Sequence, residues 1–284
     1  MKILKSLLLA LAMPMLASAA EPADTLTVFM IGDSTMANKP LDKENQERGW
    51  GQMLSMHLTG PVRVDNHAVN GRSSKSFLDE GRWDVVKQKI RPGDYVIIQF
   101  GHNDEKSKDP KRFTAPGSTF DENLRLYVKQ ARELGAIPVL MNSIARRNFP
   151  AGQEDLASES DDHQKEWNVG LSEMPREGKT LVDTHGAYLD SPRKVAEETG
   201  ATFIDLNALT MDLVQQMGPE FSKNIYMWIP AGTYEFCPKG KVDNTHLNVL
   251  GAIIVSKLAA VELARNVEGL RPYVRPEVYN LNAK

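Results

Sequence analysis

The sequence predicts an α/β fold in which helices cover both faces of a parallel β-sheet. Short apolar runs alternate with amphipathic segments along the chain, which is the pattern of repeated strand–helix–strand units. Two of the runs, 94–100 and 137–143, are almost continuously apolar, as expected for strands covered on both sides. The other predicted strands are 25–31, 62–68 and 201–206.

Three segments have the character of helices. Segment 122–135 places its apolar side chains on one stripe and ends at a glycine. Segment 191–200 begins with Ser-Pro and ends with Gly, which is typical of helix ends. Segment 246–267 predicts a long, strongly apolar final helix. The polar, turn-rich stretch from about 145 to 180 predicts a long surface excursion beside a site, not a second domain.

The first 20 residues have the pattern of a secretory signal peptide. Two lysines accompany an apolar run, and small residues follow it, so cleavage is expected after Ala19 or Ala20. Pro14 interrupts the run, which makes a membrane anchor the weaker interpretation. We therefore expect a secreted or periplasmic protein with a single domain over 21–284, a length that suits one α/β domain.

Charge and cysteine content exclude several classes of protein. The formal net charge is −3, so the chain has no basic field for nucleic acid or for an anionic membrane surface. The one cysteine, Cys237, cannot form an intramolecular disulfide, which argues against a disulfide scaffold and against a cysteine-based zinc site. Cys237 is either a small, partly buried apolar residue or a reactive thiol.

Polar residues gather where the predicted strands end. The carboxyl ends of parallel strands meet at one edge of the sheet, and α/β proteins place their sites there. Such residues follow four of the predicted strands and precede the final helix. They are Asp33, Ser34 and Thr35, then Gly71, then His102, Asn103 and Asp104, then Arg146 and Arg147, and finally Asp243 and His246.

Ser34 is the candidate nucleophile. A serine hydroxyl reacts poorly until a base removes its proton, and Ser34 taken by itself is more readily interpreted as a helix cap. Asp243 and His246 stand three residues apart at the start of the final predicted helix, where such a pair meets on one turn. The carboxylate would then orient the imidazole so that its second nitrogen accepts the Ser34 proton. The alternatives are a helix-capping aspartate and an ordinary surface histidine.

Three donors are candidates for an oxyanion hole, which acyl transfer requires. The glycine at position 71 permits a positive φ, so the Gly71 N–H can point into the site. Asn103 offers its side-chain amide, and the Ser34 N–H at a helix start is the third donor. An ordinary Asn-Gly turn at Gly71 and an Asx turn at Asn103 are the alternatives.

Other catalytic constellations lack their signatures. The GxSxG elbow is absent because Thr35 and Met36 follow Ser34, and there is no Walker or Rossmann glycine loop. No HExxH motif or dense ligand spacing is present, so we expect no metal ion and no cofactor. The residues that would have to hold a metal are scattered over several segments: Asp33, His102, Asn103, Asp104 and His246.

These motifs resemble a known family. "GDST" with Ser34, "NGRSS" with Gly71, "GHND" with Asn103, and "DNTH" with Asp243 and His246 resemble the four blocks of the SGNH (GDSL-like) hydrolases. More narrowly, these blocks together with "GWGQML" (49–54) and "DTHGAY" (183–188) are similar to the rhamnogalacturonan acetylesterase group of carbohydrate esterases. The similarity extends over nearly the whole chain after residue 20.

The resemblance implies a three-layer α/β/α, flavodoxin-like fold with a five-stranded parallel sheet. It also implies a serine O-acetylesterase that removes acetyl groups from pectic rhamnogalacturonan through an acetyl-enzyme. Ser34 would be the nucleophile, His246 the base and Asp243 its orienting partner. Gly71 and Asn103 would join the Ser34 N–H in the oxyanion hole.

The sequence offers several candidates for the substrate-binding residues and more than one candidate function. Uronic carboxylates match the planar fork of a guanidinium group, so the candidates to bind them are Arg72, Arg146 and Arg147. His102 is a further candidate for substrate binding. Each arginine could instead be solvated or anchor a loop. Removal of acetyl groups from xylan or another glycan, a broad GDSL esterase or lipase, and a non-catalytic carbohydrate-binding protein are the alternative functions.

Overall fold

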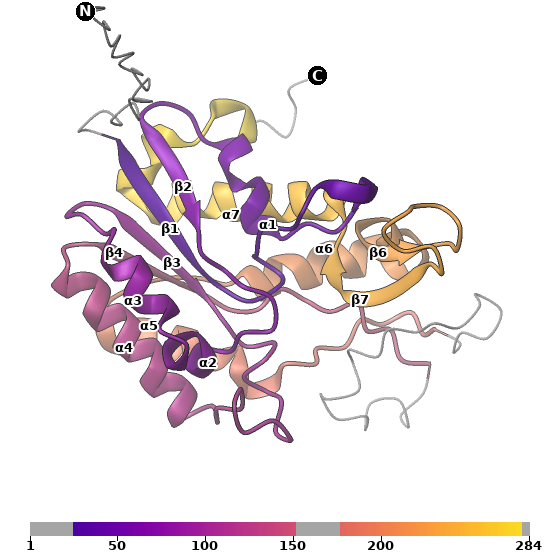
Figure 1. The fold of residues 1–284 in the computed structure, drawn as a ribbon, viewed down its shortest axis with the longest axis horizontal. Coiled ribbons are helices and arrows are strands. Elements are labelled where there is room, and N and C mark those ends of the chain that lie inside the picture. Colours follow the sequence, from indigo (N-terminus) through magenta and orange to yellow (C-terminus); the bar gives the residue numbers. More distant parts are fainter. Residues whose placement is uncertain (1–24, 152–176, 280–284) are drawn as a thin grey trace, which may run out of the picture.

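A computed structural model describes residues 25–151 and 177–279, and its centre is a five-stranded, all-parallel sheet (Figure 1). The strand order is β2-β1-β3-β4-β5, the order of flavodoxin-like doubly wound folds. All five predicted strands are present. Their bounds are β1 Leu26–Gly32, β2 Val62–Asn66, β3 Tyr95–Gln99, β4 Ile137–Met141 and β5 Thr202–Ile204.

Helices cover both faces of the sheet, which confirms the three-layer prediction (Figure 1). Alternate side chains of β1 separate the two cores: Val28 and Met30 pack on one face, and Phe29 and Ile31 on the other. The first face is covered by α1 Trp50–Met53, α6 Leu206–Phe221 and α7 Val249–Asn266. The second is covered by α2 Ser74–Asp79, α3 Arg82–Lys87, α4 Thr119–Glu133 and α5 Asp190–Thr199.

The three predicted helices correspond to α4, α5 and α7. Helix α5 ends as expected at Gly200, which has a left-handed φ of 65°. Helix α7 begins later than predicted, at Val249, because Asn248 caps it by accepting a hydrogen bond from the Gly251 N–H. Short 3-10 helices are η1 Asp42–Glu44, η2 Leu54–His57, η5 Gly186–Tyr188, η6 Ser222–Ile225, η7 Glu268–Tyr273 and η8 Pro276–Val278.

A two-stranded hairpin outside the main sheet was not predicted. Strands β6 Tyr226–Ile229 and β7 Lys241–Leu247 pair antiparallel beside the ends of the parallel strands (Figure 1). The register shifts between Tyr226, which pairs with Leu247, and Met227, which pairs with Asp243. Residues 244–246 therefore form a bulge in β7. The predicted helical turn at Asp243 and His246 is wrong, because both residues lie in this bulged strand.

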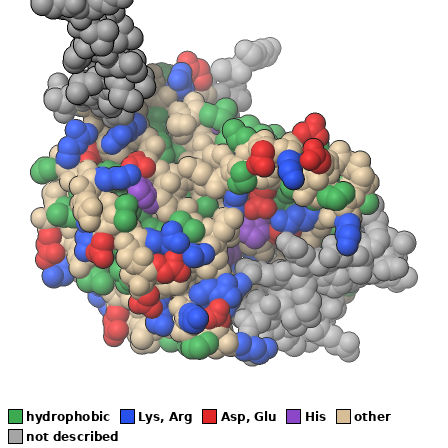
Figure 2. Space-filling model, viewed as in Figure 1, with side chains coloured by type: hydrophobic (Ala, Val, Ile, Leu, Met, Phe, Trp, Pro, Cys, Tyr) green, Lys and Arg blue, Asp and Glu red, His purple; other side chains and the backbone are tan. Residues whose placement is uncertain are grey.

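The surface excursion predicted from about 145 begins later than expected. Residues 145–147 and Phe149 are buried, since the chain runs inward after β4. Most of the excursion and the predicted signal peptide lie outside the described residues. Within those residues, none of the helices combines the length and apolarity needed to cross a membrane. Figure 2 shows Lys and Arg side chains interspersed with Asp and Glu over the visible face.

Candidate active site

The structure brings Ser34, His246 and Asp243 into direct contact. The Ser34 Oγ lies 2.7 Å from His246 Nε2, and His246 Nδ1 lies 2.7 Å from Asp243 Oδ2. Ser34 follows the end of β1, whereas the other two residues come from β7 of the outer hairpin. This is the geometry in which an imidazole, oriented by a carboxylate, takes the proton of a hydroxyl group.

The bulge in β7 explains how Asp243 orients the imidazole. Its Oδ1 accepts hydrogen bonds from the backbone N–H groups of Thr245 (2.8 Å) and His246 (2.9 Å). Its Oδ2 is then directed at Nδ1 of the same histidine, so Nδ1 donates and Nε2 keeps its lone pair toward Ser34. Burial opposes ionisation of Asp243, but the charges of His246 and Lys241 and these hydrogen bonds hold its pKa well below the usual range.

Ser34 lies in a tight turn, not at the start of a helix. The turn closes when the Ala37 N–H donates to the Asp33 carbonyl at 3.0 Å, and the chain then continues without helix to residue 41. The helix-capping alternative and the expected helix-start position of the Ser34 N–H are therefore wrong. Asp33 Oδ1 also accepts from the N–H (2.9 Å) and hydroxyl (2.8 Å) of Thr35, which stiffens the turn.

A buried hydrogen-bond chain holds this turn against the sheet. The Trp50 indole donates to Gln99 Oε1 at 2.6 Å, and the Gln99 amide donates to the Thr35 hydroxyl at 3.2 Å. The Thr35 hydroxyl in turn donates to Asp33 Oδ1. Burial raises the pKa of Asp33, although its bonds from Thr35 oppose the shift. All four side chains are buried, so the position of the Ser34 loop is determined by the core.

Two of the three candidate oxyanion donors, Gly71 and Asn103, lie on adjoining loops. Gly71 has a φ of 74°, and the Val69 N–H of its loop donates to the Gly32 carbonyl at the end of β1. The Asn103 amide donates to the carbonyl of Arg72, the residue after Gly71, at 3.2 Å. This bond uses one of the two amide hydrogens, so a second remains for a ligand. The donor roles of Gly71, Asn103 and the Ser34 N–H stay predictions.

His102 gains no support as a substrate contact, because its side chain is fully buried. Its ring lies edge-on to His185, with centroids 4.6 Å apart, and both ring nitrogens lack a hydrogen-bond partner among the described residues. Burial, followed by the charges of His185 and Arg146, lowers the pKa of His102 well below its ordinary value. The imidazole is therefore neutral at physiological pH.

Arg146 is buried in an ion pair with Glu105, so its predicted role in binding uronic carboxylates gains no support. Burial would raise the pKa of Glu105, but the charges of Arg146 and His185 outweigh it and lower the pKa to about 2. Atoms of His102, Glu105 and His185 lie within 4.8 Å of one another, which is close enough for a metal ion. The Arg146 guanidinium already neutralises the carboxylate, so the cluster fits an ion pair better than a cation site.

Arg147 is also fully buried and joins four segments. Its guanidinium contacts both Glu177 oxygens (2.6 and 2.7 Å), Ser222 Oγ (3.0 Å) and Asn244 Oδ1 (3.2 Å), and it stacks 4.5 Å over the Trp228 ring. Since Asn244 is next to Asp243, Arg147 braces the hairpin that carries Asp243 and His246. The Pro219 carbonyl accepts the remaining guanidinium N–H, so no donor is left for substrate, in contrast to the predicted role.

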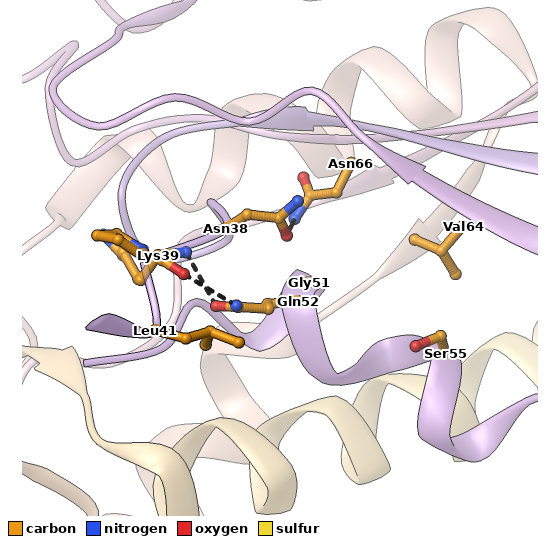
Figure 3. Close-up of a pocket in the computed structure, with 9 residues that line it drawn as sticks. Asn38, Lys39, Leu41, Gly51, Gln52, Ser55, Val64 and Asn66 are labelled. Carbon is orange, nitrogen blue, oxygen red and sulfur yellow. Dashed lines mark hydrogen bonds between the residues drawn. The ribbon is translucent and has the colours of Figure 1, made fainter. Parts of the chain in front are cut away.

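Arg72 remains a candidate for substrate binding. Its side chain is about one-third exposed and pairs with Glu80 at 3.0 Å on the surface. It directly follows Gly71, which places it at the rim of the loop with the candidate oxyanion donor. A pocket of about 400 Å³ also opens beside the segment after Ser34, and Asn38, Lys39 and Gln52 line it (Figure 3).

Three charged residues near the site were not predicted. Lys39, Glu47 and Lys241 form a row of ion pairs that ends at Asp243. The sequence contains one local indication of the contact between Lys241 and Asp243. The apolar run 226–229 and the segment from 241 flank Pro- and Gly-rich turns, which indicates a hairpin, and in a strand residue 241 shares a face with Asp243.

Comparisons with known proteins agree with this geometry. A model of the GDSL-like lipase/acylhydrolase family matches residues 30–252. A Bacillus subtilis (strain 168) protein named rhamnogalacturonan acetylesterase RhgT is 37% identical over 235 residues, covering 83% of this chain and 88% of that protein. A rhamnogalacturonan acetylesterase from Emericella nidulans is 26% identical over 232 residues, covering 81% of each.

Solved structures share the fold. The YxiM protein of Bacillus subtilis superposes with a TM-score of 0.62 at 25% identity, covering 85% of this chain but only 56% of that one. An acetylxylan esterase from Geobacillus stearothermophilus superposes with a TM-score of 0.54 at 16% identity, covering 86% and 96% of the two chains. Taken with the family match over most of its length, these findings show that the chain belongs to the GDSL-like lipase/acylhydrolase family and is a serine ester hydrolase.

Proposed function

We propose that this enzyme is a carbohydrate O-acetylesterase that removes acetyl groups from pectic rhamnogalacturonan. The observation that carries the proposal is the contact series from Ser34 through His246 to Asp243, found in a chain 37% identical to a protein named rhamnogalacturonan acetylesterase. An acetyl ester needs a nucleophile, a base and an oxyanion hole, and each has a candidate in this site.

The geometry supports a two-step mechanism. His246 Nε2 takes the Ser34 proton while Oγ bonds to the acetyl carbonyl carbon, and the oxyanion forms against the Ser34 and Gly71 N–H groups and the Asn103 amide. The carbon–oxygen bond to the sugar then breaks, and His246 gives its proton to the departing sugar oxygen. In the second step His246 removes a proton from water, hydroxide adds to the acetyl-enzyme, acetate leaves, and Ser34 regains its proton.

The substrate is tested by measuring acetate release from acetylated rhamnogalacturonan oligosaccharides, acetylated xylo-oligosaccharides and an aryl acetate. We expect the highest kcat/KM on the rhamnogalacturonan oligosaccharides, and no release from any of the three by Ser34→Ala. An equal or higher kcat/KM on the xylo-oligosaccharides would contradict the proposed substrate but leave the esterase mechanism intact. Failure to release acetate from any glycan would contradict the carbohydrate assignment.

We also propose that the protein is exported, since a pectic polymer is an extracellular substrate and the first 20 residues have the pattern of a signal peptide. The test is N-terminal sequencing of the protein recovered from the periplasm or the medium. A start at Ala20 or Glu21 supports export, whereas full-length protein confined to the cytoplasm contradicts it.

A further inference from the structure

A row of alternating charges ends at the carboxylate of the catalytic site. Glu47 lies between two lysines, with Oε1 2.7 Å from Lys39 Nζ and Oε2 3.0 Å from Lys241 Nζ. Lys241 Nζ also lies 3.2 Å from Asp243 Oδ2, the oxygen that accepts the hydrogen bond from His246. We call Lys39, Glu47 and Lys241 the charge chain.

The charge chain is largely shielded from water. The exposed fractions of the side chains are 2% for Lys39, 17% for Glu47 and 16% for Lys241. Burial alone would raise the pKa of Glu47, but the charges of His246 and the two lysines lower it to about 2. Loss of either lysine would leave the shielded Glu47 carboxylate with one cation in place of two, and loss of Glu47 would remove the anion that lies between the two lysines, so the three groups hold one another in position.

Lys39 connects the charge chain to the loop that carries Gly71. Its Nζ donates to Asn70 Oδ1 at 2.6 Å, and Asn70 directly precedes Gly71, the candidate oxyanion donor. The Lys39 backbone is itself fixed, because the Gln52 amide accepts from its N–H (2.9 Å) and donates to its carbonyl (3.1 Å) (Figure 3). A continuous series of contacts therefore runs from the His246 imidazole to the loop that carries Gly71, which we call the oxyanion loop.

We propose that the charge chain is a positioning unit, in which Lys241 restrains and partly neutralises Asp243 while Lys39 anchors the loop that carries Gly71. This inference rests on the catalytic roles proposed above. The charge chain does not contact the reacting atoms. It acts through Asp243, the partner of the imidazole, and through the loop that carries Gly71.

The electrostatic consequence has a definite sign. The Lys241 cation opposes the field of Asp243, so its removal stabilises the protonated imidazole of His246. Removal of the Glu47 anion has the opposite effect, since Glu47 attracts the protonated form. The charged or titratable groups that face the imidazole come from several elements: Asp243 and Lys241 on β7, Glu47 ahead of α1, Asp33 after β1 and His102 after β3.

The first test is the pH dependence of kcat/KM on an aryl acetate. We expect the acidic limb to move up by about 1 pH unit in Lys241→Met and down in Glu47→Gln. Lys241→Arg, which restores the charge, should return the limb toward the wild-type position. Lys129→Met is the control, because Lys129 makes a 2.7 Å pair with Glu133 on the exposed face of α4 and should leave the profile unchanged.

The outcomes separate positioning from mere stabilisation. A structural role alone would lower activity or the melting temperature without moving the limb, and an unmoved limb in both Lys241→Met and Glu47→Gln overturns the electrostatic half of the proposal. Glu47→Gln keeps the side-chain shape, so it decides the question even if Lys241→Met fails to fold. Failure of the proposed catalytic roles shows separately, as acetate release that persists in Ser34→Ala.

Lys39→Met tests the link to the oxyanion loop. We expect kcat to fall about 10- to 100-fold with little change in KM, because a loosened loop misplaces the Gly71 N–H relative to the oxyanion. Lys39 is linked to the imidazole only through Glu47, Lys241 and Asp243, so the acidic limb should move less than in Lys241→Met. A wild-type kcat in a folded Lys39→Met enzyme overturns this half of the proposal.

Discussion

Ser34 and His246 are 212 positions apart in the chain, yet Ser34 Oγ lies 2.7 Å from His246 Nε2. The first residue is placed by the end of a central strand and the second by a bulged strand of a separate hairpin. Their contact therefore depends on how the hairpin docks against the sheet. Changes that disturb the bulge or the brace behind it should affect catalysis as strongly as changes to the pair itself.

Replacing Asp243 with asparagine should lower kcat by up to about 10⁴. An amide can donate toward Nδ1, which would favour the tautomer whose Nε2 carries the proton and cannot accept one from Ser34. KM on an aryl acetate should change little. A kcat within tenfold of wild type, in a variant with an unchanged circular dichroism spectrum, would show that Asp243 does not orient the imidazole.

Asn103→Ala should lower kcat about 10²- to 10³-fold if the amide stabilises the oxyanion. The substitution also removes the bond to the Arg72 carbonyl, which should cost about 1 kcal/mol of unfolding free energy. Urea unfolding and steady-state kinetics on the same samples distinguish the two effects. Loss of stability with unchanged kcat would make Asn103 a structural residue.

Arg147→Met should destabilise the fold by at least about 2 kcal/mol and lower activity. The guanidinium joins Glu177, Ser222 and Asn244, so its loss frees the hairpin from the body of the protein. Arg72→Met is the matched control because Arg72 is a partly exposed arginine, and its cost should stay near 0.5 kcal/mol. Equal free energies of unfolding for the two variants would contradict the bracing role.

The buried Glu105–Arg146 pair should make stability depend on pH. The folded-state pKa of Glu105 is lowered to about 2, so its contribution is present above the unfolded-state value of about 4.3 and is lost as the pH falls toward 2. We expect Glu105→Gln to cost about 3 kcal/mol at pH 7 and much less at pH 3, measured by urea unfolding.

Glu133→Gln is the control for this measurement, since Glu133 pairs with Lys129 at the surface and should cost little at either pH. A cost for Glu105→Gln that is the same at pH 7 and pH 3 would show that the carboxylate contributes no charge-dependent stability.

The sheet and the grouping of Ser34, Asp243 and His246 were predictable because their signals are local. A strand buried on both faces must be apolar throughout, and each of the motifs around Ser34, Gly71, Asn103 and His246 is contiguous. The predicted helical turn behind the Asp243–His246 contact is nevertheless wrong. Spacing of three suits a helical turn, and only the pairing of β6 with β7 turns the same spacing into a bulge.

The buried charges were less predictable, because their partners are distant in the sequence. Glu47 meets Lys241 across 194 positions, and nothing local indicates the pair. Arg146 and Arg147 look like surface residues in a polar stretch, but the chain turns inward after β4 and carries both into the core. Tertiary docking, which local patterns do not encode, decides whether an arginine meets substrate or a carboxylate of its own chain.

We propose Ser34 as the nucleophile and His246 as the base that activates it. The most direct measurement is peptide mapping by mass spectrometry after treatment with a serine-directed fluorophosphonate. We predict a single adduct on Ser34, absent in Ser34→Ala and formed far more slowly in His246→Ala. An adduct on another residue together with acetate release by Ser34→Ala at the wild-type rate would contradict both roles.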